Sequence, residues 1–241
     1  MYDIAVIGGG PAGLSAAVNA RARNKTVLVV TNPPAENPLY RAEKVNNYLG
    51  MPDMTGAQML DTFLTHAKSA GAELRTGRVL SILPMGNTYF LSIGSDVAEV
   101  RAVILATGVA RGAKYPGEAE LLGAGVSYCA TCDGMLYRGK KVAVIGLSGD
   151  ARHEADFLRG LDCEVVYFDK PGKFEIRGES KVEALLADGA EHAVEGVFIL
   201  RPTLAPTDLL PGLAVEGGYV AVDRQMRTNL PGVFAAGDCT G

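Results

Sequence analysis

The feature that most constrains this chain is a glycine-rich run near its N-terminal end, Gly8-Gly9-Gly10-Pro11-Ala12-Gly13, which stands between an apolar and an alanine-rich stretch. Residues 2–7 are apolar and partly β-branched, so they predict a strand, and the alanine-rich residues up to Arg23 predict a helix. A second apolar run occupies residues 26–30. Because a helix-length crossover separates the two strands, they must run parallel. The chain therefore opens with a βαβ unit. Further along, residues 56–69 predict a helix, because apolar side chains recur at helical spacing on one side, at Met59, Leu60, Phe63, Leu64 and Ala67.

The glycines of this loop have the G-x-G-x-x-G spacing, at Gly8, Gly10 and Gly13. Between a strand and a helix, such glycines let backbone N–H groups and the positive helix end meet a pyrophosphate without a side chain in the way. A purely structural turn is the alternative. The acidic residue expected about 20 positions further on, which would bind a ribose hydroxyl, is absent, because Val30-Thr31-Asn32 occupies that place. The adenosine end is then held differently, or more weakly.

A second strand-turn-helix pattern lies in the middle of the chain. Residues 142–145 predict a strand, Gly146-Leu147-Ser148-Gly149 a turn and residues 151–161 a helix, and a strand follows at 163–168. The two patterns are similar enough to be one architecture used twice. They indicate an α/β fold with two Rossmann-like units.

The second unit is predicted to be abridged. Only seven residues separate Phe168 from Ile176, whereas a parallel crossover needs about a dozen or more. No third parallel strand can be reached there. Residues 181–200, with Asp188-Gly189 at a hairpin position, instead predict an antiparallel meander.

Two of the four cysteines, Cys129 and Cys132, are separated by two residues, which in an intracellular chain indicates metal or redox chemistry. A zinc site would need two further ligands, and the chain has no second paired motif, so we predict no metal. A dithiol can close to a disulfide and exchange with another disulfide. The adjacent Asp133 is placed to supply a proton when the bond opens; its alternative role is a helix or turn cap.

Composition narrows the choice of partners. The net charge is −4, aromatic residues make up 7% of the chain and there is no Trp, which argues against a nucleic-acid surface. No apolar run approaches the roughly 20 residues of a membrane helix, and no charged leader precedes the first strand. We expect a cytoplasmic protein that binds neither nucleic acid nor membrane.

Several motifs together resemble the low-molecular-weight thioredoxin reductases, over nearly the whole chain. They are Gly8-Gly9-Gly10-Pro11-Ala12-Gly13, Ala106-Thr107-Gly108, Cys129-Ala130-Thr131-Cys132-Asp133-Gly134 and Gly237-Asp238. The resemblance implies FAD as cofactor, thioredoxin as acceptor and a homodimer. It also implies an FAD-binding domain at 1–112 and 208–241, with a disulfide domain at 113–207 inserted into it.

The resemblance also implies which residues act. Cys132 would exchange electrons with the flavin, Cys129 would attack the disulfide of thioredoxin, and Asp133 would be the acid. Asp238 would hold the ribityl chain and Asn47 would lie near the flavin. The full set of cofactor-binding residues implied is Gly8, Gly10, Pro11, Ala12, Gly13, Asn47, Thr107, Gly108, Gly237 and Asp238.

This sequence differs from the NADPH-using members of the family at positions that bear on the electron donor. Members that use NADPH have a second G-x-G-x-x-A loop and a His-Arg-Arg cluster after the next strand. Here the middle glycine is Ser148, the strand ends in Tyr167-Phe168-Asp169 with a single Lys170, and Arg201 stands where those relatives usually have a glycine. A phosphate without arginines loses charge-assisted hydrogen bonds worth about 1.5–3 kcal/mol each. The chain is therefore most similar to the ferredoxin-dependent flavin thioredoxin reductases, which implies ferredoxin as donor.

Three alternatives stay open. An NADPH-dependent thioredoxin reductase with an atypical pocket is disfavoured by the missing basic cluster. A diflavin-linked disulfide oxidoreductase would bind a second FAD. A flavin-binding regulatory protein without turnover would have no chemical need for the intact set of Cys129, Cys132 and Asp133.

Overall fold

The computed structural model describes residues 1–108, 114–149, 151–201 and 204–241. The chain divides into two compact units, which we call unit 1 (Met1–Ala110 with Thr203–Gly241) and unit 2 (Arg111–Pro202). Each unit has hydrophobic core clusters of its own. The two are therefore described separately.

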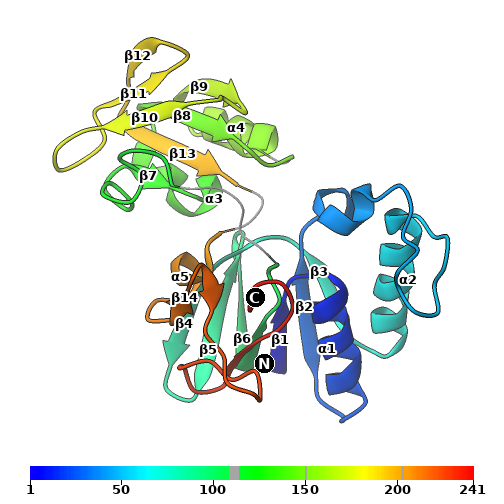
Figure 1. Ribbon diagram of the computed structural model, residues 1–241. Coiled ribbons are helices and arrows are strands. Elements are labelled where there is room, and N and C mark those ends of the chain that lie inside the picture. The colour runs from blue at the N-terminus through cyan, green and yellow to red at the C-terminus, as the bar shows by residue number, and fades with distance from the viewer. Residues whose placement is uncertain (109–113, 150, 202–203) are drawn as a thin grey trace. The chain divides into compact units, whose positions relative to one another are not determined.

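Unit 1 is built on a seven-stranded mixed sheet (Figure 1). Across the sheet its strands are β3 (Glu73–Thr76), β2 (Val27–Thr31), β1 (Tyr2–Ile7), β6 (Asp96–Leu105), β5 (Thr88–Ile93) and β4 (Val79–Met85), with β16 (Val233–Ala235) also beside β6. β1 runs parallel to β2 and β6, and β16 runs parallel to β6. The βαβ unit predicted at the start of the chain is confirmed.

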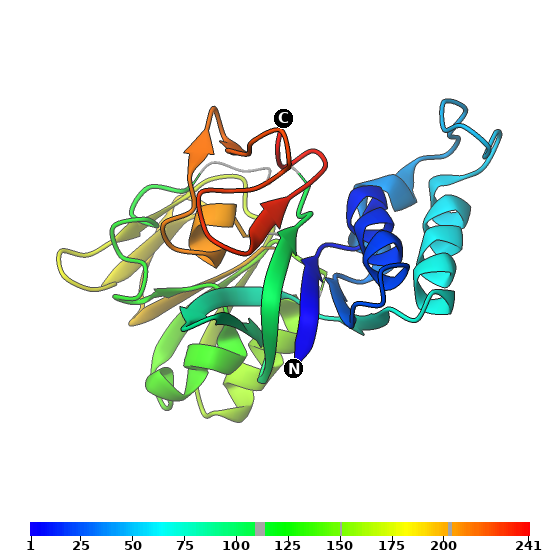
Figure 2. The same ribbon diagram turned by 90° about the horizontal axis from the view of Figure 1, so that it is seen from below.

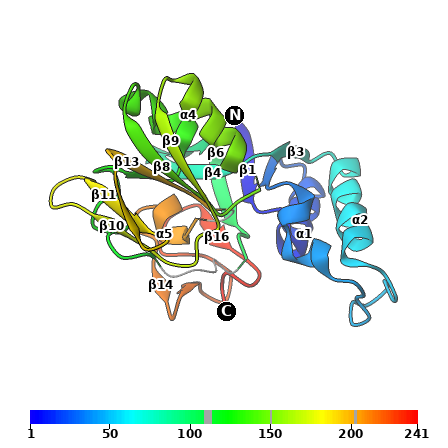
Figure 3. The same cartoon turned by 90° about the horizontal axis from the view of Figure 1, so that it is seen from above.

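Two helices of unit 1, α1 (Pro11–Arg21) and α2 (Gly56–Ser69), lie side by side (Figure 3). α2 has the predicted bounds and starts with a capping box between Thr55 and Gln58. Its apolar side is buried at Met59, Leu60 and Ala67 and joins the core cluster that also contains α1 residues. The helical spacing seen in the sequence is confirmed.

The remaining elements of unit 1 are short. They are η1 (Pro34–Glu36), η2 (Pro38–Arg41), α5 (Pro206–Leu209), β14 (Val215–Glu216) and β15 (Tyr219–Val220). Figure 2 shows the N-terminus and the C-terminus at opposite ends of the unit 1 sheet. None of the helices in the described ranges combines the length and apolar character needed to cross a bilayer.

Unit 2 holds a parallel sheet and a separate antiparallel one. The parallel sheet is ordered β7 (Val126–Ser127), β13 (Gly196–Leu200), β8 (Lys141–Gly146) and β9 (Glu164–Asp169). The antiparallel sheet is β10 (Phe174–Arg177), β11 (Ala184–Ala187) and β12 (Ala190–Ala193). The helical segments are α3 (Ala130–Asp133), η3 (Gly134–Tyr137) and α4 (Ala151–Gly160).

The meander predicted for residues 181–200 is confirmed in part and wrong in part. The hairpin of β11 and β12 turns at Asp188 and Gly189, both at positive φ, as a type I′ turn requires. Residues 196–200, however, form β13, which pairs in parallel with β8. All five are buried, and a strand covered on both faces is typical of a parallel sheet. The abridgement lies at the other edge, where β9 has no outer neighbour among the described strands.

Candidate active site

Three loops of unit 1 meet at the carboxyl ends of neighbouring parallel strands. They follow β1 (residues 8–13), β6 (residues 106–108) and β16 (residues 236–238). The N–H of Ala236 donates to the Leu105 carbonyl at 2.9 Å, and a Cβ built on Gly237 would lie 2.7 Å from that of Ala12. In open α/β sheets, ligands bind at this end of the strands.

The structure requires glycine at two positions of the first loop for close packing and leaves open space at the third. Gly8 has φ +118°, and a Cβ there would lie 2.1 Å from the Ala106 carbonyl oxygen. A Cβ on Gly13 would lie 2.1 Å from the carbonyl oxygen of Gly8. Beside Gly10, by contrast, the nearest atom to such a Cβ is Asn37 Nδ2 at 4.0 Å. Gly8 and Gly13 permit close packing, whereas Gly10 leaves space that a ligand can enter.

These residues fit the pyrophosphate and hydroxyl groups of FAD. Gly10 is the N-cap of α1, makes no side-chain cap hydrogen bond, and the first turn of the helix carries no acidic residue. An anion is therefore favoured at this helix end. Thr107 Oγ1 is buried and has no hydrogen-bond partner among the residues that the structure describes, so a polar ligand group would satisfy it. Gly10 and Thr107 thus fit a bound cofactor, and Pro11 lies beside Gly10 as the first residue of α1.

Not every predicted cofactor residue is brought to these loops. Gly108 and Asp238 follow β6 and β16 and lie at the strand ends, with Asp238 exposed. Asn47 lies in an exposed stretch between η2 and α2 and is not part of the three loops. Its position near the flavin remains a prediction.

In unit 2 the predicted dithiol is closed as a disulfide between Cys129 and Cys132, with 5.4 Å between the Cα atoms. The one-turn helix α3 starts directly after Cys129, and the Cys129 sulfur accepts the N–H of Cys132 at 3.0 Å. Cys129 is buried and Cys132 is exposed. The pair can therefore take up two electrons and two protons to become a dithiol, with Cys132 as the accessible end.

The carboxylate of Asp133 is held by a residue that the sequence analysis missed. The Ser127 hydroxyl donates to Asp133 Oδ2 at 2.7 Å and accepts the N–H of Cys129 at 3.1 Å. Ser127 is 4% exposed. Asp133 precedes η3 but makes no side-chain cap hydrogen bond there, so the turn-cap alternative is not supported. The signal in the sequence was a serine in an otherwise apolar strand, two residues before the first cysteine.

A second missed residue, Glu154, contacts the same turn. Its Oε2 accepts the N–H of Ala130 at 3.0 Å, at the start of α3. Glu154 belongs to the first turn of α4. The sequence alone could not predict this contact, because Ala130 and Glu154 are 24 residues apart.

A buried ion pair of unit 2 is hydrogen-bonded to Tyr128, the sequence neighbour of Cys129. Glu118 is fully buried, and the Arg201 guanidinium binds both of its carboxylate oxygens. The hydroxyl of Tyr128, the neighbour of Cys129, donates to Glu118 at 2.8 Å. Burial raises the pKa of Glu118, but the hydrogen bonds from Arg201, the Tyr115 N–H and Tyr128 outweigh it and leave the pKa lowered. Arg201, a departure from NADPH-using relatives, thus has a structural role here.

The other two cysteines are not exposed thiols. Cys163 is buried and its Sγ donates to the Tyr137 carbonyl at 3.0 Å. Burial raises the pKa of the Cys163 thiol, which disfavours the reactive thiolate. Cys239 is also buried and donates to the carbonyl oxygens of Leu105 and Ala236. Both are packing residues.

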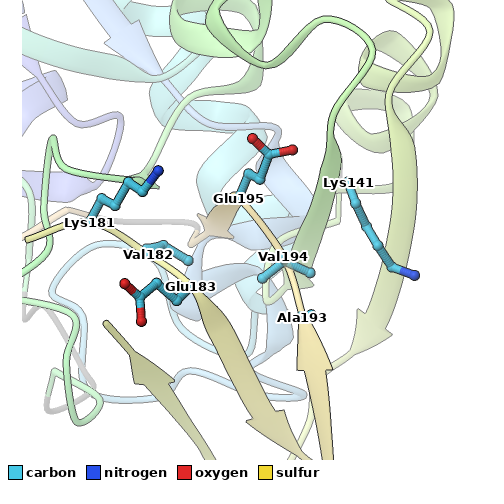
Figure 4. A pocket seen from close by; sticks show the side chains of 7 residues that line it. All are labelled: Lys141, Lys181, Val182, Glu183, Ala193, Val194 and Glu195. Atoms are coloured by element: carbon cyan, nitrogen blue, oxygen red, sulfur yellow. The ribbon is translucent and has the colours of Figure 1, made fainter. Parts of the chain in front are cut away.

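Unit 2 also contains a cavity of about 370 Å³ (Figure 4). It is lined by Lys141, Lys181, Val182, Glu183, Ala193, Val194 and Glu195. Basic and acidic side chains are mixed around it, and no cysteine is among them. The redox chemistry of the chain is not located there.

Comparison with known proteins agrees with this site. A model of the pyridine nucleotide-disulphide oxidoreductase family matches residues 2–175 and 170–241. A thioredoxin reductase from Listeria innocua is 33% identical over 99% of this chain and 86% of its own length. Among solved structures, a ferredoxin-flavin thioredoxin reductase from Clostridium acetobutylicum is 41% identical, with a TM-score of 0.89 over 100% of this chain and 89% of that one. A thioredoxin reductase from Gloeobacter violaceus is 31% identical, with a TM-score of 0.82 over 99% and 85%.

The resemblance inferred from the motifs is thereby confirmed, as is the α/β fold class. FAD is the cofactor of this family, and the open space beside Gly10 fits it. The chain therefore belongs to the pyridine nucleotide-disulphide oxidoreductase family, as a flavin-dependent disulfide oxidoreductase homologous to thioredoxin reductases.

Proposed function

We propose that this protein is a thioredoxin reductase, in which unit 1 is the FAD-binding domain and unit 2 the disulfide domain. The observation that carries the proposal is the Cys129–Cys132 disulfide at the start of α3, with Asp133 at the end of the same turn. The names of the Listeria and Clostridium relatives support thioredoxin as the acceptor. FAD, when bound, supplies a group that can take up electrons singly and give two to a disulfide.

Cys129, Cys132 and Asp133 each have a separate role in this proposal. Exposed Cys132 is the sulfur that receives electrons from the cofactor side, and opening the disulfide takes two electrons and two protons. Asp133 delivers one of these protons to the sulfur that leaves. Cys129, freed from the bond, gives up its proton and attacks the thioredoxin disulfide as the thiolate, which forms a mixed disulfide and leaves the other thioredoxin sulfur to take up a proton. Cys132 then attacks the Cys129 sulfur, which releases reduced thioredoxin and restores the starting disulfide.

Ferredoxin is proposed as the donor, because the second glycine loop is unsuited to a dinucleotide phosphate. A phosphate binds where a helix N-terminus offers free N–H groups and positive potential. Here the middle glycine is Ser148, and the first turn of α4 carries the carboxylate of Glu154. A like charge at this point disfavours the pyrophosphate. The Clostridium relative, which is a ferredoxin-flavin thioredoxin reductase, supports the same donor.

The end of β9 is equally unsuited to a 2′-phosphate. The hydroxyl of Tyr167 lies 2.2 Å from where a Cβ on Gly146 would be, so its ring fills the space over the loop. Arg152 stacks on that ring at 4.9 Å and pairs with Asp169 at 3.2 Å. The guanidinium is thus engaged by a carboxylate of this chain, at the strand end where NADPH would need free cations.

The donor is tested by mixing the purified protein anaerobically with either NADPH or chemically reduced ferredoxin. Flavin bleaching is followed first, and thioredoxin reduction second. We expect bleaching and thioredoxin reduction with ferredoxin, and neither with NADPH. Rapid bleaching by NADPH would instead support the NADPH-dependent reductase with an atypical pocket.

The cysteine roles are tested with single variants. Cys132→Ser should abolish turnover but leave Cys129 able to form a stable mixed disulfide with thioredoxin, visible by non-reducing electrophoresis. Cys129→Ser should not form it. Full thioredoxin reduction by Cys132→Ser would refute the redox assignment. No thioredoxin reduction by the unmodified protein with either donor would instead favour the flavin-binding regulatory protein.

Two further points rest on the family resemblance. We propose a homodimer, for which light scattering should give twice the 25.2 kDa mass of the chain. We also propose one FAD per chain; a ratio of two would indicate the diflavin-linked oxidoreductase. Released flavin is quantified against protein by absorbance.

A further inference from the structure

The Ser127 hydroxyl contacts both ends of the disulfide turn, residues 129–133. Ser127 ends β7, which pairs with β13 in the parallel sheet, so its backbone is fixed by the core of unit 2. Its Oγ accepts the N–H of Cys129 and lies 2.7 Å from Asp133 Oδ2 and 3.2 Å from the Cys129 carbonyl oxygen. A hydroxyl has one proton to donate. The shorter contact and the stronger acceptor assign that proton to Asp133.

This hydrogen bond distinguishes the two oxygens of the Asp133 carboxyl. Oδ2 is engaged by a donor, so a proton on the carboxyl belongs on Oδ1. A carboxyl group otherwise rotates between equivalent orientations, because its terminal torsion is broad and roughly two-fold. Holding Oδ2 therefore fixes the direction from which Asp133 delivers its proton. It also leaves a donor in place to stabilise the carboxylate after the proton has left.

We propose that Ser127 is a positioning residue for proton transfer, which aims the Asp133 carboxyl at the sulfur that leaves when the disulfide opens. The inference rests on the proposed role of Asp133 as the acid. In the step concerned, an external thiolate attacks one sulfur, the Cys129–Cys132 bond breaks, and the leaving sulfur takes the proton from Asp133. The attacking thiolate supplies the electron pair, and Asp133 becomes a carboxylate that Ser127 continues to hold.

The step can be measured on the full protein without flavin turnover. Dithiothreitol opens the disulfide, the reaction is quenched with acid at set times, and the new thiols are alkylated and counted by mass spectrometry. We expect Ser127→Ala to slow opening about tenfold, as for loss of one hydrogen bond to a charged group. Asp133→Asn should slow it about 100-fold, at the lower end for a lost general acid.

Three readouts separate positioning from a structural effect. Ser127→Ala added to Asp133→Asn should cause no further loss, because the hydroxyl then has no acid to aim. Increasing the concentration of a buffer acid such as imidazolium should restore part of the rate in Ser127→Ala and little in the unmodified protein. Ser127→Thr, which keeps the hydroxyl, should recover most of the rate.

Ser148→Ala is the matched control, since it removes another buried hydroxyl from unit 2 and should leave opening unchanged. An unchanged rate in Ser127→Ala, or losses that add to those of Asp133→Asn, would overturn the inference while leaving the acid role of Asp133 intact. An unchanged rate in Asp133→Asn would instead overturn the proposed acid itself. If the extra methyl of Ser127→Thr does not fit, the double variant and the buffer acid still decide.

Discussion

The buried pair of Glu118 and Arg201 allows a sharp test of how unit 2 is held together. Glu118 is 0% exposed and the Arg201 side chain 12%. Removing one partner of a buried pair leaves the other charge uncompensated and costs about 3–5 kcal/mol, far more than a surface pair. We therefore expect Arg201→Met to destabilise unit 2 by about 3–5 kcal/mol at neutral pH.

The lowered pKa of Glu118 decides how the stability of unit 2 changes with pH. Burial raises that pKa, the hydrogen bonds from Arg201, Tyr115 and Tyr128 lower it, and the net direction is down. A carboxyl with a depressed folded pKa contributes stability that is fully present above its unfolded pKa, about 4.3, and is lost as the pH falls through the folded value. In Arg201→Met the pairing is gone, so the cost should shrink as the pH is lowered toward 4 and the unpaired Glu118 takes up a proton.

Hydrogen exchange read by peptide mass spectrometry suits this test, because it reports the two units separately and needs no two-state unfolding of the whole chain. Arg177→Met is the matched control: Arg177 also pairs with two carboxylates, of Glu175 and Glu191, but at the surface. Its loss should change unit 2 exchange very little. Equal effects of Arg201→Met and Arg177→Met, or an effect of Arg201→Met that is the same at neutral and acid pH, would refute the reasoning.

Three shorter predictions concern the cofactor loops and the free thiols. Gly10→Val should fold, because a Cβ there meets open space, but the variant should purify without flavin colour. Gly8→Val should fail to fold, because its Cβ would lie 2.1 Å from the Ala106 carbonyl oxygen. Thr107→Val should leave the flavin-free protein as stable or up to about 1–3 kcal/mol more stable, since the Thr107 hydroxyl is buried without a partner in the described part of the chain. The same variant should lower FAD affinity in a fluorescence titration. Cys163 should resist iodoacetamide in the folded protein and react only on denaturation, since it is buried and burial raises its pKa.

Local patterns in the sequence were sufficient for the elements that they specify completely. The βαβ opening and the helix at residues 56–69 were predicted correctly, because each is defined by the spacing of its own apolar residues and its flanking glycines or cap. The strand at 196–200 was placed in the meander, because a short continuous apolar run fits either sheet. Only its pairing with β8 decides the matter, and that pairing joins residues far apart in the chain.

The candidate site likewise has parts that the sequence predicts and parts that it does not. The disulfide and the glycine loop have sequence signatures, whereas the contacts that hold them do not. Glu118 and Arg201 are 83 residues apart, so neither identifies the other in a single sequence. Among the supporting residues, Ser127 could have been found from the sequence, because it follows the apolar Val126 and stands two residues before Cys129.

The proposed ferredoxin donor leads to a prediction about Glu154, which is that NADPH use is not easily introduced. Its carboxylate sits in the first turn of α4, where a dinucleotide phosphate would need positive potential, and it accepts the N–H of Ala130 at the start of the disulfide turn. Restoring the missing groups with Ser148→Gly and Asp169→Arg would leave this charge in place, so we expect flavin bleaching by NADPH to stay slow. Adding Glu154→Ala should improve nucleotide binding but free the Ala130 N–H and loosen α3, so disulfide opening should change as well. If the first two substitutions alone gave rapid bleaching, Glu154 would not be the obstacle, and the same helix could serve a phosphate and the disulfide at once.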